Sequence, residues 1–369
     1  MRSSVGSFFL SLMLCSLPVH AAPAPPAAAS MPTSKELAAQ APTLEGMYAY
    51  REILVQNVKE KHIDALQQHF EERLRDVEQG KITDSTVAFM FAMVGEVDEP
   101  DAGTFDLWTE AYPQSFIGPL ARAAFNMHRA WSGRGNKMAR NTLASEFAEM
   151  ERWLPMVRRD AQLALQREPR CALCYAQLIE LSMPLRLDKE ALEWFNQGMA
   201  ANGDSIAVPK AYFHALDSRW GGSEDEQAAM SEKLRLAGHE RASRRLTAQL
   251  MADRIAYSRW SSPEQASEAL AAALAALALA DTYTGRNAQA RALQYLERHA
   301  EAVDAFTSIV NEDNSPAELF EARSYSYAKL GRWPESVRDL RIAYDRFGSP
   351  WAFESLVKLR NGHWGRILT

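Results

Sequence analysis

The chain has few cysteines and almost no long apolar runs. Only three cysteines occur in 369 residues, too few for a fold held together by many disulfides. Beyond the first twenty residues, the longest apolar run is residues 270–280, which is rich in alanine and too short to cross a bilayer. We therefore expect no stable membrane span once an N-terminal signal is removed.

Motifs for common chemistries are also missing. The sequence contains no HExxH, GxSxG, Walker-type or GxGxxG pattern, so metalloprotease, serine hydrolase and nucleotide-binding sites have no local support. The formal net charge is -6, which argues against a general nucleic-acid binder. We expect no cofactor and no metal, and we favour a non-catalytic protein while leaving catalysis open.

No segment shows the sustained apolar and polar alternation of a β-strand. Apolar residues instead recur at helical spacing, as in Leu66, Phe70 and Leu74. Ser223 is followed three residues later by Glu226, and Ser262 by Gln265, which predicts two capped helix starts. The sequence therefore predicts an all-α protein.

The N-terminus has the features of an export signal. Arg2 precedes an apolar stretch, and Val19-His20-Ala21 fits a cleavage site, so we predict a signal peptide over residues 1–21. Residues 22–42 are rich in Ala and Pro and predict a flexible linker. We expect an exported protein, with the periplasm as its compartment and release from the cell as the alternative.

Two segments near the C-terminus superimpose at a constant offset along the sequence. Ala302 maps onto Ser336, Phe306 onto Leu340, and Ile309 onto Ala343. The offset equals the length of one tetratricopeptide unit, about 34 residues, and this part of the chain resembles that superfamily. The resemblance implies a right-handed solenoid of antiparallel helix pairs, with the repeats over residues 262–369. Such scaffolds bind a protein or peptide partner on a concave surface.

The preceding region, residues 43–261, is similar to the bacterial family called domain of unknown function 4034. The residues that carry this resemblance lie in two short motifs, namely Trp131 and Arg134 in the first and Trp220, Gly221, Gly222 and Ser223 in the second. The family has no assigned activity, so the resemblance implies no catalytic residues. We read the two glycines physically, as a helix end that needs left-handed backbone angles.

Cys171 and Cys174 are separated by two residues, which is the spacing of thiol oxidoreductases. Redox motifs of this kind usually follow a strand, and none is predicted here. We favour a local structural disulfide, with buried free thiols or a thiol-disulfide redox protein as alternatives. Zinc would require further ligands, which the scattered histidines do not supply.

Basic residues are concentrated in one segment that includes Arg241, Arg244 and Arg245. Arg241 and Arg245 lie one helical turn apart and are candidates to hold a carboxylate of a bound peptide, although a solvated helix face explains them too. His62 and His69 are seven residues apart, wider than the usual spacing of metal ligands on a helix. A hydrolase site that brings together Asp106, His128 and Arg129 has no supporting motif.

Overall fold

The computed structural model describes residues 44–97, 101–135, 137, 139–256, 258–310 and 317–360. Every regular element among them is a helix, and they contain no strand, as the periodicity predicted. The predicted signal peptide (1–21) and linker (22–42) lie outside the described residues. None of the described helices is long and apolar enough to cross a lipid bilayer.

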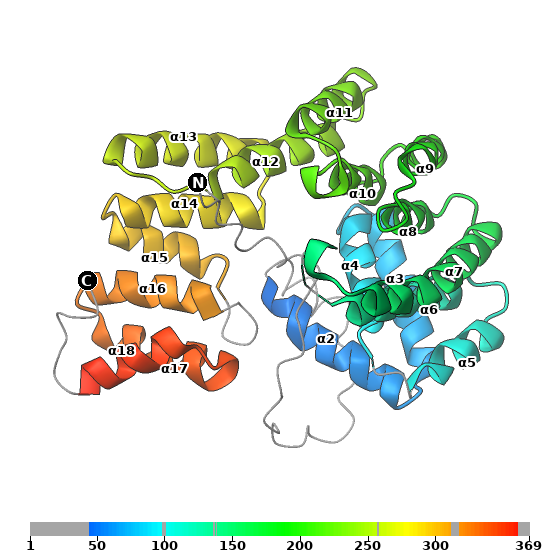
Figure 1. Cartoon of the computed structure of the whole chain (residues 1–369), viewed down its shortest axis with the longest axis horizontal. Helices are drawn as coiled ribbons and strands as arrows, with labels where there is room; N and C mark the ends of the chain where they lie inside the picture. The colour runs from blue at the N-terminus through cyan, green and yellow to red at the C-terminus, as the bar shows by residue number, and fades with distance from the viewer. Residues whose placement is uncertain are drawn as a thin grey trace. The chain divides into compact units, whose positions relative to one another are not determined.

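The chain divides into two compact units. Unit 1 contains residues 53–202, and unit 2 contains the described residues from 203 onward together with the beginning of α2 (Leu44–Lys59), so that the division falls within this helix. The predicted boundary between residues 261 and 262 stays a prediction. Figure 1 labels the helices of both units along the chain.

Unit 1 has a core of aromatic side chains. The rings of Phe70 and Phe91 lie 4.2 Å apart, and those of Phe105 and Phe125 lie 5.1 Å apart. Trp108 is fully buried and donates a hydrogen bond of 2.8 Å from Nε1 to Oε1 of Gln67, so its polar atom is satisfied inside the core. The elements of this unit are α3 (Ile63–Glu78), α4 (Asp84–Val94), α5 (Gly103–Ala111), α6 (Ile117–Arg134), η3 (Ala139–Asn141), α7 (Ala144–Arg167), α8 (Ala172–Ser182) and α9 (Asp188–Ala201).

Unit 2 consists of helices in which neighbours along the chain pack side by side (Figure 1). Ser223 and Ser262 accept hydrogen bonds from the backbone N–H groups of Glu226 and Gln265, so both predicted caps are confirmed. The elements are α10 (Ala207–Ala215), η4 (Ser218–Trp220), α11 (Glu224–Leu236), α12 (Glu240–Ala256), α13 (Pro263–Leu279), α14 (Tyr283–Tyr295), α15 (His299–Thr307), α16 (Ala317–Lys329), α17 (Trp333–Phe347) and α18 (Pro350–Arg360).

The offset that relates Ala302 to Ser336 reappears in the helix boundaries. The same offset carries both ends of α14 onto both ends of α16, and the start of α15 onto the start of α17. We call residues 283–309 the first repeat and residues 317–343 the second repeat. Both repeats bury the mapped residues, since Ala302, Phe306, Leu340 and Ala343 are each 0% exposed.

One turn geometry recurs throughout the described chain. A residue with positive φ stands two positions before the start of a helix in six places, three of them in residues other than glycine. These residues are Lys61, Arg186, Gly238, Glu297, Gly331 and Gly348. The left-handed conformation reverses the chain at a helix end, so the same backbone device connects successive helices in both units.

Candidate functional site

Polar residues follow one stripe of α12. Arg241, Arg245, Gln249 and Asp253 are spaced by four residues, which places them on one side of the helix over three turns. Leu246, Ala248 and Ala252 are buried and form part of the core. The stripe therefore carries positive charge near the start of the helix and a carboxyl group near its end.

Arg245 is the most unusual member of this stripe. Burial lowers the pKa of its guanidinium, the neighbouring charge of Arg241 lowers that pKa further, and Asp281 opposes the shift. In the described part of the chain no carboxylate lies within ion-pair distance of Arg241 or Arg245. Two neighbouring cations, one of them partly desolvated, thus make no ion pair within the described residues, and this favours binding of an anionic group.

Arg244, the third basic residue predicted for this site, has a different partner. Its Nη2 donates a hydrogen bond of 3.4 Å to the backbone oxygen of Ala278, near the C-terminal end of α13. A cation at this position complements the helix dipole. Arg244 therefore helps to join α12 to α13, and Arg241 and Arg245 remain the two arginines of this segment that make no ion pair or hydrogen bond within the described residues.

The other end of the stripe is held between two helices. Gln249 Nε2 on α12 donates to Oδ1 of Asp253 at 2.7 Å and contacts Oγ1 of Thr284 on α14 at 3.0 Å. Burial raises the pKa of Asp253 to about 7, against the effect of the Gln249 hydrogen bond, and Asp217 raises that pKa further. Asp253 has no local signal in the sequence, because its raised pKa depends on burial between helices that are distant in sequence.

Cys171 and Cys174 form a disulfide at the start of α8. Cys171 is the N-cap residue and its Sγ accepts a hydrogen bond of 3.2 Å from the N–H of Cys174. The two residues are 5% and 0% exposed. A thiol substrate must reach a sulfur atom to exchange with it, so the burial of both residues favours a structural role over the redox alternative.

Trp131 and Arg134 lie at the corner between α6 and α7. The guanidinium of Arg134 is 5.7 Å from the ring centres of Trp131 and Phe147, and its Nη1 donates to the backbone oxygens of Gly135 and Lys137 at 3.1 and 2.8 Å. Burial lowers the pKa of Arg134, so part of its hydration has been replaced by these protein contacts. This motif residue stabilises a turn and leaves little of its charge for a ligand.

The second motif forms another corner, around η4. Gly221 adopts φ of 100°, as expected for the left-handed end of a helix, and a Cβ on Gly222 would lie 2.1 Å from the backbone oxygen of Leu216. Trp220 Nε1 lies 3.4 Å from Nε2 of His214. Burial lowers the pKa of His214 to about 4, so it is neutral at pH 7. The expected left-handed angle is thus found at Gly221 but not at Gly222, where glycine is needed because the backbone of Leu216 lies too close for a side chain.

The remaining candidate groups, Asp106, His128 and Arg129, make separate contacts among the described residues. Asp106 pairs with Arg122 at 2.7 Å, His128 contacts Ser132 at 3.3 Å, and Arg129 lies over the ring of Trp153. Burial lowers the pKa of His69 to about 4. Nowhere in the described ranges do three His, Cys, Asp or Glu side chains come together in a way that could hold a metal ion.

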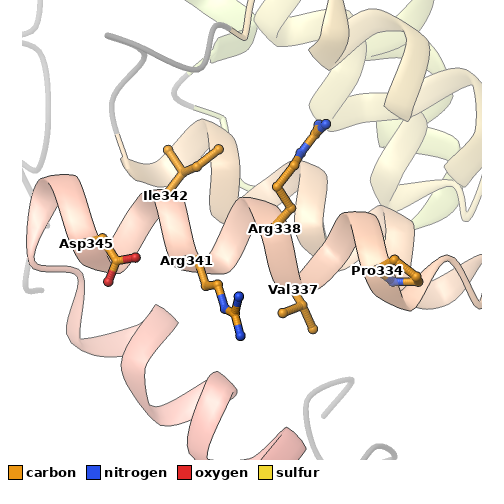
Figure 2. Close-up of a pocket in the computed structure, with 6 residues that line it drawn as sticks. All are labelled: Pro334, Val337, Arg338, Arg341, Ile342 and Asp345. Carbon is orange, nitrogen blue, oxygen red and sulfur yellow. The ribbon is translucent and has the colours of Figure 1, made fainter.

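One surface hollow lies on α17 and another along α7. A cavity of about 270 Å³ lies on α17, and Figure 2 shows that all six of its labelled residues, including Arg338, Arg341 and Asp345, come from this one helix. A larger cavity of about 610 Å³ runs along α7, where Arg158 pairs with Glu190 and Arg159 with Asp160. Neither hollow is lined by a partly buried cation that makes no ion pair within the described residues, whereas Arg245 on α12 is such a cation.

No known protein family and no curated protein matches this chain.

Proposed function

We propose that this protein is an exported, non-catalytic helical-repeat scaffold that binds a protein or peptide partner in the cell envelope. Arg241 and Arg245 hold a carboxylate of the partner, and the surrounding helices supply a rigid surface. The observation that carries the proposal is the half-buried Arg245, which lies beside a second cation and has no carboxylate within ion-pair distance in the described residues.

The repeated backbone supports the scaffold part of the proposal. Helices that recur at the tetratricopeptide period and share one turn geometry are typical of a right-handed solenoid of antiparallel pairs. Such a chain builds a long surface from neighbouring units and needs no catalytic group to recognise a partner. We also propose that residues 43–261 are related to the domain of unknown function 4034. That family has no assigned activity, so the relationship does not suggest a reaction.

The arginine pair differs from other arginines of unit 2. Arg235 donates two hydrogen bonds to Glu232, at 2.7 and 2.6 Å, and Arg298 donates two to Glu301 at the same distances. These guanidiniums are already satisfied on the surface, where an ion pair contributes little. Arg241 and Arg245 have no such internal partner, so an external carboxylate is the group that would satisfy them.

The proposal also places the protein outside the cytoplasm, in the cell envelope. The predicted signal at residues 1–21 supports it, and the Cys171–Cys174 disulfide is of the kind that persists in an oxidising compartment such as the periplasm. Fractionation of cells that produce the tagged full chain tests this point. Retention in the cytoplasm with residues 1–21 intact would contradict it.

The binding test uses a peptide library in which each peptide has either a free C-terminal carboxylate or an amide. We expect residues 22–369 to prefer free carboxylates, and Arg241→Ala with Arg245→Ala to weaken that binding at least about tenfold, because charged hydrogen bonds are lost. The matched control is Arg235→Ala with Arg298→Ala, which removes two arginines that are internally paired. Equal binding by the two double variants would refute the anchor assignment.

A further inference from the structure

The outer face of α18 exposes several large apolar side chains. Trp351, Phe353 and Val357 are 39%, 47% and 41% exposed, and Tyr344 on α17 is 40% exposed. The rings of Tyr344 and Phe353 lie 5.2 Å apart and Val357 lies one turn beyond Phe353, so these three residues form one surface region, whereas Trp351 projects from another side of the helix. The opposite face of the helix carries Ala352, Ser355 and Leu359, which are buried. An apolar region of this kind usually marks an interface.

Among the described residues, the outer face of α18 lacks the covering helix that the equivalent face of α16 has. The start of α18 falls one position short of a full repeat period after the start of α16. Phe320 stands three residues after the start of α16, is 0% exposed, and packs in a core to which α17 contributes. Phe353 stands at the same place in α18 and is 47% exposed. In the described part of the chain no following helix covers α18 as α17 covers α16.

The charges on this face are self-complementary. Glu354 and Lys358 are exposed and lie one turn apart, next to Phe353 and Val357, which are also one turn apart. When two copies of α18 pack antiparallel through their outer faces, about a two-fold axis level with residues 355–356 along the helix, Glu354 of each copy lies near Lys358 of the other. The same axis places Phe353 of each copy opposite Val357 of the other.

We propose that two copies of this chain associate through the outer face of α18, with the α18 helices antiparallel. Each copy supplies the helix that covers the apolar face of the other. A membrane surface fits this face less well, because Glu354 lies among the apolar residues and would be drawn into the lipid boundary. This proposal is independent of the carboxylate site on α12.

The first test measures the mass of residues 22–369 by sedimentation velocity at protein concentrations from about 1 to 200 µM. We expect a concentration-dependent dimer. Phe353→Glu with Val357→Glu should weaken it on the order of thirtyfold or more, because charges replace the centre of the interface. The control is Leu236→Glu, which changes an exposed leucine on α11, away from α18 in the sequence, and it should leave the dimer intact. A wild-type chain that stays monomeric throughout this range overturns the proposal.

The second test uses charge reversal and depends on the antiparallel pairing. Glu354→Lys alone and Lys358→Glu alone each place like charges opposite one another, and each should weaken self-association about tenfold or more. An equimolar mixture of the two variants restores both opposite-charge contacts and should form the heterodimer. Circular dichroism verifies that every variant is folded. Failure of the mixture to associate better than either variant alone refutes this arrangement.

Discussion

The first and second repeats share their helix starts and the turn between their two helices, but they bury different side chains. Their helices start at equivalent positions, and the turn residues Glu297 and Gly331 are both left-handed. In both, the residue after the turn donates a backbone hydrogen bond of 2.9 Å, from Arg298 to Leu293 and from Arg332 to Tyr327. The repeats therefore share the turn geometry and the helix starts, whereas the ends of their second helices differ: α15 ends at Thr307, which corresponds to Arg341, and α17 continues to Phe347.

Their interiors differ at one pair of equivalent positions. In the second repeat, Arg323 Nε and Nη2 donate to both carboxylate oxygens of Asp339, at 2.7 and 2.9 Å, and the two side chains are 4% and 0% exposed. The first repeat has Gln289 and Ala305 at these positions. A buried ion pair in one repeat thus occupies the positions of an uncharged pair in the other, and the helices still start at equivalent positions.

The largest expected effect comes from breaking that ion pair. Asp339→Ala leaves the Arg323 guanidinium buried without its counter-ion and should lower the free energy of unfolding by about 3–5 kcal/mol. Hydrogen exchange of the α16 and α17 backbone amides measures this loss locally. A loss of less than about 1 kcal/mol would show that the pair is not a stabilising feature of the second repeat.

The double variant Arg323→Gln with Asp339→Ala sharpens the comparison, because it gives the second repeat the residues of the first. We expect it to recover most of the stability that Asp339→Ala alone removes, since no buried charge remains. If the double variant is as unstable as the single one, the interiors are not interchangeable.

The next effect concerns the position of the largest side chains. The first repeat buries Phe306 where the second has Leu340, whereas the second buries Phe320 where the first has Arg286. Leu340→Phe therefore adds volume to a repeat that already contains a buried ring, and it should cost about 1–3 kcal/mol. Urea unfolding measures this cost. Phe306→Leu in the first repeat, which removes volume, is the matched control and should cost on the order of 1 kcal/mol.

The turns give a smaller effect with opposite signs in the two repeats. Gly331→Ala should cost about 1 kcal/mol, because a Cβ disfavours left-handed angles although no atom lies within 4 Å of it. Glu297→Gly should stabilise the first repeat by about 0.5 kcal/mol, since it relieves the same strain. Thermal unfolding of both variants measures the changes. Equal signs for the two would show that the turns are not equivalent.

The smallest effect is a difference in pH dependence. His299 in the first repeat corresponds to Trp333 in the second, which does not titrate. Burial lowers the pKa of His299 from 6.5, as does Lys329, so the unfolded chain binds this proton more readily. Stability should therefore fall slightly as the pH drops below 6.5.

His299→Gln should flatten that part of the pH profile, while Trp333→Phe should leave its slope unchanged. Urea unfolding at about pH 5 and pH 7.5 measures both slopes. If the His299→Gln variant keeps the wild-type slope of stability against pH, the proton taken up on unfolding binds to a group other than His299.

The sequence predicted what depends on local spacing. The four-residue recurrence of Leu66, Phe70 and Leu74 predicted a helix, and Leu66 and Phe70 are fully buried in α3. The capping serines predicted two helix starts correctly. The repeat period predicted the equivalence of α14 with α16, because helix length and turn geometry are encoded by neighbours along the chain.

Contacts between distant helices were decided only by the tertiary structure. Arg241 and Arg245 could be selected as a basic pair from sequence, but the partial burial of Arg245 and its lack of a carboxylate partner among the described residues could not. The pKa of Asp253 and the pairing of Arg323 with Asp339 likewise depend on which helices become neighbours. Helix periodicity is a short-range property, whereas desolvation and ion pairing depend on side chains that packing alone brings together.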